Sequence, residues 1–125
     1  MLNTLLIFIG AGLGGVFRYW LSNGAYWLLG RGFPYGTLIV NSTGCFLMGL
    51  LFVLILDRFN GLGQQLRPFL LIGFLGGYTT FSSFSIETLN LYESGDWLGA
   101  SLNILLSMII CIFLTWLGMI WGRHL

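Results

Sequence analysis

The most constraining feature of the sequence is a charge-free segment over residues 68–86. It is long enough to cross a bilayer, which takes about 20 apolar residues in a helix. Its centre nevertheless holds paired glycines, paired threonines and three serines, which are poor residues for an uninterrupted apolar helix. Backbone that leaves the helix inside a bilayer must be buried in protein or line a wet cavity. The segment therefore predicts a discontinuous membrane helix that presents free carbonyls and half-helix ends to ions.

The composition is that of an integral membrane protein. Of the 125 residues 57% are apolar and only 7% are charged, whereas a soluble domain has about a quarter charged. Four segments have the length and character of membrane spans: residues 2–29, 36–56, 68–91 and 97–122. Short loops are expected between them, at 31–34, 60–67 and 93–96. These segments predict a single all-α unit over residues 1–125, with four transmembrane helices and a broken third helix.

The positive charges barely distinguish the two sides of the membrane. With four spans both termini share a side with the second loop, and that side carries Arg58, Arg67 and Arg123. The other side carries Arg31, with Arg18 late in the first span. So small a difference does not orient the chain firmly, and it allows insertion in both directions.

A four-helix chain cannot easily enclose a polar pathway and also seal it from lipid, so we expect at least a homodimer. Gly10, Gly14 and Arg18 share one stripe of the first helix, and Gly-x-x-x-Gly lets two helix backbones approach closely. That stripe is compatible either with packing inside one subunit or with a contact between subunits.

Catalytic and metal-binding patterns are missing from the sequence. Cys45 and Cys111 both lie inside spans without a second cysteine or histidine at metal-ligand spacing, and the one histidine, His124, is terminal. Structural filling is the better interpretation of the two cysteines. With no nucleophile–base pair and no phosphate loop in the sequence, we expect that the protein is not an enzyme.

Two phenylalanines follow the predicted break. Phe81 and Phe84 are three residues apart and share a helix face. Such pairs are usually core packing, but the positive edge of an aromatic ring can also face an anion. Ser82, Ser83 and Ser85 add hydroxyl donors between them. A lining rich in donors and free of cations favours a small, strongly hydrated anion.

Polar residues also form stripes on the second and fourth spans. Asn41 shares a face with Thr37, Gly44 and Met48, so its amide can either bond a neighbouring helix or donate to a passing anion. The fourth span repeats small or polar side chains every four residues, which predicts either close packing or a polar track along the helix; they are Asn103, Ser107, Cys111 and Thr115.

Arg18 and Glu87 are the two charged residues well inside apolar segments. Intramembrane charges usually face the protein interior and are functional by default. Because each lies toward a span end, snorkelling or mutual pairing remains an alternative. Arg18 at the mouth of a pathway would raise the local anion concentration. In the narrow part, its full charge would hold an anion too tightly for release.

Three motifs together carry a resemblance to a known family. They are Gly14-Gly15-Val16-Phe17-Arg18-Tyr19, the segment from Gly36-Thr37-Leu38 to Asn41-Ser42-Thr43-Gly44, and Gly76-Gly77-Tyr78-Thr79-Thr80-Phe81-Ser82-Ser83-Phe84-Ser85. In this order, and in a four-span chain of this size, they make the sequence resemble the Fluc (CrcB) fluoride channels of microbes over essentially its whole length.

The resemblance implies an antiparallel, dual-topology homodimer in the bacterial inner membrane, with two pores and passive, selective export of fluoride. Asn41, Phe81 and Phe84 would be pore residues and Arg18 a vestibule residue. Broken third helices would cross at the dimer centre and hold a sodium ion (Na⁺) by the backbone carbonyls of Gly76 and Thr79. Further predicted pore residues are Thr37, Ser82, Ser107 and Thr115. Position 111 holds a cysteine where the resemblance leads us to expect a hydroxyl-bearing residue. The implied partners are fluoride, sodium, lipid and a second copy, with no nucleic acid.

Two other function classes fit the size of the chain. A proton-coupled exporter of the small multidrug type also has four spans, but it needs a membrane carboxylate, usually in the first span, where this chain has only Arg18. A membrane assembly subunit that transports nothing would explain the glycines. It would not need polar residues at the centre of the third span and along the fourth.

Overall fold

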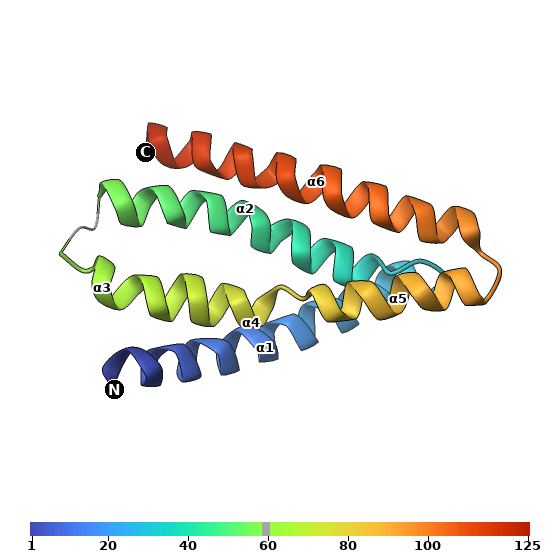
Figure 1. Ribbon diagram of the computed structural model, residues 1–125, viewed down its shortest axis with the longest axis horizontal. Coiled ribbons are helices and arrows are strands. Elements are labelled where there is room, and N and C mark those ends of the chain that lie inside the picture. Colours follow the sequence, from blue (N-terminus) through green and yellow to red (C-terminus); the bar gives the residue numbers. More distant parts are fainter. Residues whose placement is uncertain (59–60) are drawn as a thin grey trace.

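The chain folds into four long helical spans arranged side by side (Figure 1). The computed structural model describes residues 1–58 and 61–125. The elements, in chain order, are α1 (Leu2–Leu29), α2 (Tyr35–Asp57), α3 (Gly63–Leu66), η1 (Arg67–Leu75), α4 (Gly76–Tyr78), α5 (Phe81–Glu93) and α6 (Trp97–His124). Both termini lie at the same end of the molecule, as an even number of spans requires.

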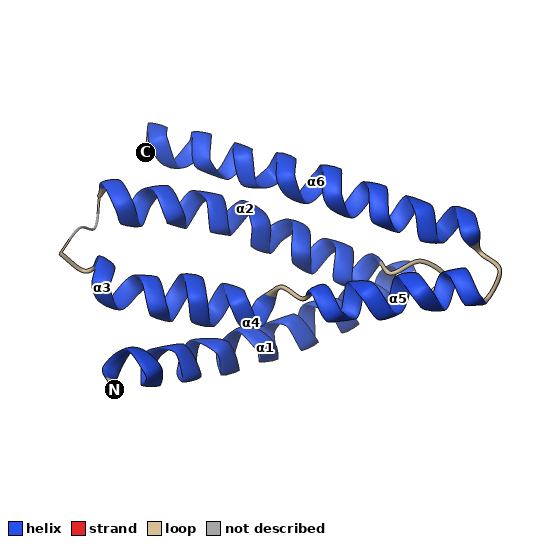
Figure 2. Cartoon of the chain, in the orientation of Figure 1, coloured by secondary structure: helices blue, strands red, loops and turns tan. Residues whose placement is uncertain are grey.

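The prediction of four membrane-spanning helices is confirmed, because four helical segments are long and apolar enough to cross a bilayer. The third of these segments extends over Gly63–Glu93 and combines α3, η1, α4 and α5. The predicted loop at 60–67 begins at Asn60, outside the described residues, and from Gly63 onward its place is taken by helix. Figure 2 shows the short loops that join the other spans.

The third span contains two changes of backbone geometry. After α3, the segment η1 is π-helical, with Pro68 in its first turn. After α4, Thr79 (φ −83°, ψ 157°) and Thr80 (φ −150°, ψ 120°) are extended, and α5 begins at Phe81. We call Thr79 and Thr80 the extended link. The Thr80 hydroxyl accepts a hydrogen bond from the Ser83 amide, so the second residue of the link is also the N-cap of α5.

Glycines set the closest contacts between the spans. A Cβ at Gly10 or Gly14 of α1 would clash with the backbone carbonyl of Phe69 or Phe74 in η1. A Cβ on Gly77 of α4 would likewise meet the Ala11 carbonyl of α1. The Gly10–Gly14 stripe is therefore used inside the subunit, for packing between the first and third spans. This settles the choice between the two uses of the stripe.

A second glycine contact joins α2 to α6. A Cβ on Gly49 would clash with the Thr115 carbonyl, and one on Gly118 would clash with the Phe46 carbonyl. The two helix backbones thus touch over this stretch. In a membrane the lipid tails are as apolar as the side chains, so the hydrophobic effect does not drive helices together. Small residues let the helix backbones pack closely instead.

The buried core lies beside the extended link. Val40 of α2 and Leu75 of η1 are fully buried, and Tyr78 of α4 is 4% exposed. Many large apolar side chains elsewhere point outward, including Phe8 and Trp27. Their exposure is that of a surface made to contact lipid.

We expect Gly14→Ala to destabilise the protein by about 1–3 kcal/mol, because the added methyl meets backbone atoms of η1 and α4 that cannot turn aside. The measurement is the thermal unfolding midpoint of the purified protein in detergent. Gly12→Ala is the matched control, since a Cβ at Gly12 meets nothing within 4 Å. Equal midpoints for the two variants would contradict the packing role of Gly14.

Candidate functional site

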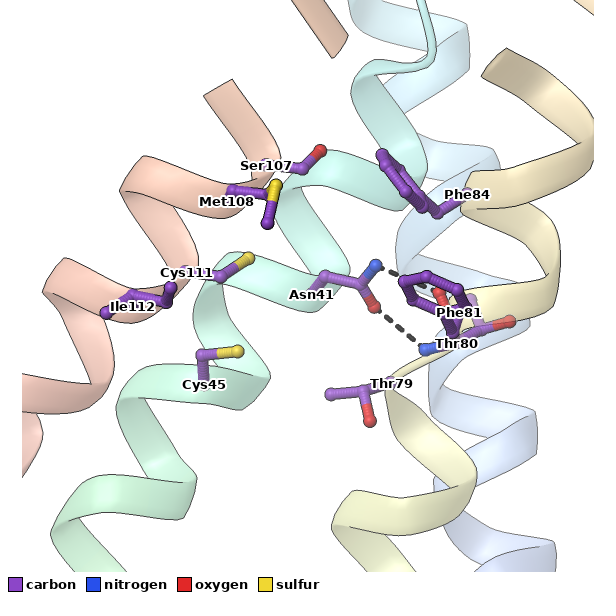
Figure 3. A pocket seen from close by; sticks show the side chains of 10 residues that line it. All are labelled: Asn41, Cys45, Thr79, Thr80, Phe81, Phe84, Ser107, Met108, Cys111 and Ile112. Atoms are coloured by element: carbon purple, nitrogen blue, oxygen red, sulfur yellow. Dashed lines mark hydrogen bonds between the residues drawn. The ribbon is translucent and has the colours of Figure 1, made fainter. Parts of the chain in front are cut away.

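A groove of about 300 Å³ runs beside the extended link, between α2, α5 and α6 (Figure 3). Among the described residues, its walls carry polar, aromatic, aliphatic and sulfur-containing side chains and no charged one. The lining residues are Asn41, Cys45, Thr79, Thr80, Phe81, Phe84, Ser107, Met108, Cys111 and Ile112. The groove thus brings together four predicted pore residues from three helices: Asn41, Phe81, Phe84 and Ser107.

Asn41 fastens the extended link to α2. Its Oδ1 accepts a hydrogen bond from the Thr80 amide at 2.8 Å, and its Nδ2 donates to the Thr80 carbonyl at 3.0 Å. Figure 3 draws both bonds side by side. The side chain therefore gives the Thr80 amide, which has left the helix, a partner, and it adds a donor at the Thr80 carbonyl. Bonding to a neighbouring helix is what the structure shows for this amide, and the second hydrogen on Nδ2 is not used by these bonds.

The Phe81 and Phe84 rings stand on the α5 side of the groove, across from the α6 residues (Figure 3). Their centroids are 5.4 Å apart and their planes are inclined by 45°. Phe81 is 78% exposed and Phe84 is partly buried. Neither ring belongs to the buried core of the subunit, so simple core packing does not account for the pair.

The small and polar residues that repeat along α6 differ in their partners, because Asn103 and Ser107 belong to a hydrogen-bonded chain that reaches α5 and Thr115 bonds within α6. Asn103 is 2% exposed and donates from Nδ2 to the Thr88 hydroxyl at 2.8 Å, and that hydroxyl donates to the Phe84 carbonyl at 2.7 Å. Ser107 donates to Asn103 Oδ1 at 3.4 Å. Together these bonds tie α6 to the backbone of a groove phenylalanine. Thr115 donates to the Cys111 carbonyl of its own helix and is not part of the groove lining.

A second cavity, of about 200 Å³, lies on the other side of the extended link. We call it the inner cavity; it is lined by Arg18, Ser22, Tyr26, Thr37, Val40, Thr80, Ser83 and Glu87. Thr80 borders both the inner cavity and the groove. Thr37 therefore lies in a different cavity from Asn41, although the two share a stripe on α2.

Both intramembrane charges border the inner cavity, and each has hydrogen-bond partners. The Glu87 carboxylate accepts hydrogen bonds from the hydroxyls of Tyr26 and Thr37. Arg18 donates from Nε to the Gly77 carbonyl at 3.1 Å. The sequence singled out Glu87 but gave no reason to pair it with Tyr26. A carboxylate inside a span needs donors, and that need is the signal that points to Tyr26 and Thr37.

The extended link also changes the partners of nearby carbonyls. In a continuous α-helix the Thr80 amide would donate to the Gly76 carbonyl, but here it donates to Asn41. Gly76 is exposed on the surface of the subunit, and Thr79 is partly buried beside the groove.

Ser82, a predicted pore residue, lies outside the groove lining. Its hydroxyl is 3.2 Å from that of Thr80.

Comparison with known proteins identifies relatives over the full length of the chain. Residues 5–119 match the model of a family described as "CrcB-like protein, Camphor Resistance (CrcB)". A protein of Coxiella burnetii named fluoride-specific ion channel FluC is 61% identical, over 99% of this chain and all of its own length. A Geobacter sulfurreducens protein of the same name is 48% identical over the whole of both chains. A Methylococcus capsulatus protein, also so named, is 48% identical over 99% of this chain and 54% of its own.

We expect Asn41→Ala to destabilise the protein by about 2–5 kcal/mol, because the Thr80 amide loses its partner inside the membrane and the Thr80 carbonyl loses a donor. Thermal unfolding in detergent measures the loss, and hydrogen exchange should become faster at the Thr80 amide. Asn90→Ala is the matched control, since Asn90 is exposed on α5. An unchanged exchange rate at Thr80 would show that Asn41 does not hold the link.

Proposed function

The chain belongs to the CrcB family, and we propose that it lets fluoride leave the cytoplasm passively through the groove beside the extended link. The protein is a fluoride channel and not an enzyme, as the names of its relatives indicate. The observation that carries the pathway is the meeting of an amide, two aromatic rings and a serine in one uncharged groove. We further propose that it works as a multi-pass protein of the bacterial inner membrane.

The groove offers an anion weak donors of several kinds. Asn41 keeps one amide hydrogen beyond its bond to Thr80, Ser107 brings a hydroxyl, and the phenylalanines bring positive ring edges. Fluoride gains more from close donors than larger halides do, because its charge is concentrated in a smaller ion. A set of neutral donors replaces its hydration water in steps and still allows release.

The open groove favours assembly as an antiparallel homodimer. A polar pathway in a bilayer must be closed off from lipid, yet Phe81 is 78% exposed in the single subunit. A second copy would cover that face and complete two pores. The nearly even distribution of arginines between the two sides of the membrane is compatible with insertion of the chain in both directions.

We propose that the carbonyls of Gly76, at the start of α4, and of Thr79, directly after it, hold a structural sodium ion at the dimer centre. The residues fit the ion, because hard cations take oxygen ligands and the Gly76 carbonyl is released by the link. Thr79 would add a second carbonyl beside it, whereas Gly77 already accepts from Arg18. A fixed cation there would favour an anion in the nearby groove.

In this proposal Arg18 acts by its positive charge on anions that enter the inner cavity. Its charge raises the concentration of anions near Thr80 without entering the uncharged groove. Thr37 lines the same cavity, where its hydroxyl and that of Tyr26 donate to the Glu87 carboxylate and so disperse the negative charge that opposes Arg18. Ser82 and Thr115 lie outside the groove lining of one subunit, so their part in the pore depends on the second copy.

The first test is anion efflux from liposomes that contain the purified protein, followed with a fluoride electrode. Valinomycin should trigger rapid release of fluoride and no release of chloride. Phe81→Ile and Phe84→Ile should each abolish fluoride release, because an aliphatic side chain has no positive ring edge. Size-exclusion chromatography should still show the dimer in both variants.

Phe8→Ile is the matched control for the ring variants. Phe8 is 77% exposed, almost as much as Phe81, but it lies on α1 away from the groove. Its replacement should leave fluoride release unchanged. Normal release in both groove variants would remove the rings from the pathway, and no release from folded wild-type dimer would refute the channel itself.

Removing sodium tests the proposed central ion. Protein purified with sodium present should retain a single sodium ion per dimer after desalting, as measured by atomic emission. Protein prepared throughout with N-methylglucamine in place of sodium should release fluoride slowly, and added sodium should restore the rate. A preparation that contains no sodium and conducts at the normal rate would contradict the proposal.

A further inference from the structure

Three sulfur-containing side chains gather on one stretch of the groove. Cys45 comes from α2, and Cys111 and Met108 come from α6. Figure 3 shows the three sulfur atoms following one another along the groove wall. Both cysteines are free and half-buried, and Met108 is 57% exposed. On sequence alone, structural filling is the better interpretation of the cysteines, because neither has a second cysteine or histidine at metal-ligand spacing.

The close packing of α2 on α6 brings the two thiols together. Gly49 lies one turn from Cys45, and Gly118 lies two turns from Cys111, on the helix faces that touch. The Cys111 sulfur lies 4.0 Å from the hydroxyl of Ser42, which is one turn before Cys45. Cys45 and Cys111 line the same groove, and Figure 3 shows their sulfur atoms next to each other on its wall. Two thiols from different helices thus share one small space.

We propose that Cys45 and Cys111 form a binding site for a soft, thiophilic metal cation in the groove, with Met108 beside it. Thiolates and thioethers are the ligands that soft metals prefer. Within residues 1–58 and 61–125, no group of three or more His, Cys, Asp or Glu side chains could hold a metal, so the protein ligands of this site are the two thiols and the thioether. Each thiol gives up its proton to solvent as its sulfur bonds the metal, and no oxidation or reduction takes place.

The position of the site predicts block of the channel. Cys45 and Cys111 line the same 300 Å³ groove as Asn41, so a bound metal occupies space that the anion needs. The described lining of the groove has no lysine or arginine that would repel an arriving cation. This consequence rests on the proposed pathway, whereas the binding itself rests only on the two thiols.

The first experiment measures binding without transport. The reduced protein in detergent is titrated with cadmium ions in chloride-free buffer, and the thiolate-to-metal absorption band is followed in the ultraviolet. The wild type should give the band at a ratio of one ion per subunit. Cys45→Ser and Cys111→Ser should each raise the half-saturating concentration about 100-fold, since each variant removes one of two ligands. Equal binding by the wild type and both variants, or no band in the wild type, would overturn the site.

The second experiment measures fluoride release from liposomes with and without cadmium. The rate for each variant is compared with its own rate before metal is added. Block should need about 100-fold more cadmium in either cysteine variant than in the wild type, and a chelator should reverse it. Met48→Leu is the control and should leave the block unchanged, because Met48 carries its sulfur on the same helix as Cys45 but does not line the groove.

The two experiments separate failure of the site from failure of the pathway. Binding in detergent together with unimpeded release would keep the metal site and exclude the groove as the route of fluoride. Block at the same cadmium concentration in the wild type and both cysteine variants would overturn the site, because the metal would then act elsewhere.

Discussion

The rest of the structure depends on the need to satisfy backbone hydrogen bonds inside a bilayer. Two extended residues in the middle of a membrane span leave amide and carbonyl groups without helical partners, and lipid offers none. Asn41 resolves this conflict for Thr80 by bonding both of its backbone groups from the neighbouring helix. The same two bonds hold the extended link in place between the inner cavity and the groove, and they put the side-chain amide of Asn41 at the groove wall. Support of the backbone and presentation of a donor are thus combined in one side chain.

Much of the fold could be predicted from the sequence because bilayer thickness and backbone satisfaction leave few alternatives. Four long apolar segments become four spans, and the extended residues Thr79 and Thr80 fall within the stretch rich in glycine, threonine and serine. The π-helical geometry of η1 was not predicted, because Pro68 and the following apolar residues are equally compatible with an ordinary helix. Helix ends also differ from the predicted spans, since polar residues such as Gln64 continue a helix beyond its apolar part.

The candidate site was only partly predictable because a stripe on one helix does not say which neighbour it meets. Thr37 and Asn41 share a stripe, yet the extended link passes between their cavities and separates them. Cys45 and Cys111 are remote in sequence, and only the close contact of α2 with α6 at the glycines makes them neighbours. The bond of Tyr26 to Glu87 likewise joins residues of two helices that are far apart in the sequence, α1 and α5. Contacts between helices, rather than patterns along them, decided these positions.

The glycine contacts also have a consequence for the time scale of ion passage. Backbones that touch at Gly14 and Gly49 leave no gap in which the helices can slide past one another. Displacement of whole helices takes microseconds to milliseconds, whereas side-chain rotations take picoseconds to nanoseconds. In the proposed pathway, the Gly49 contact holds α2 and α6, two walls of the groove, so these walls adapt to an ion through side-chain rotation. For the proposed pathway we therefore expect throughput to be governed by fast local rotations and by the loss of water from the ion, with no slow movement of whole helices in each crossing.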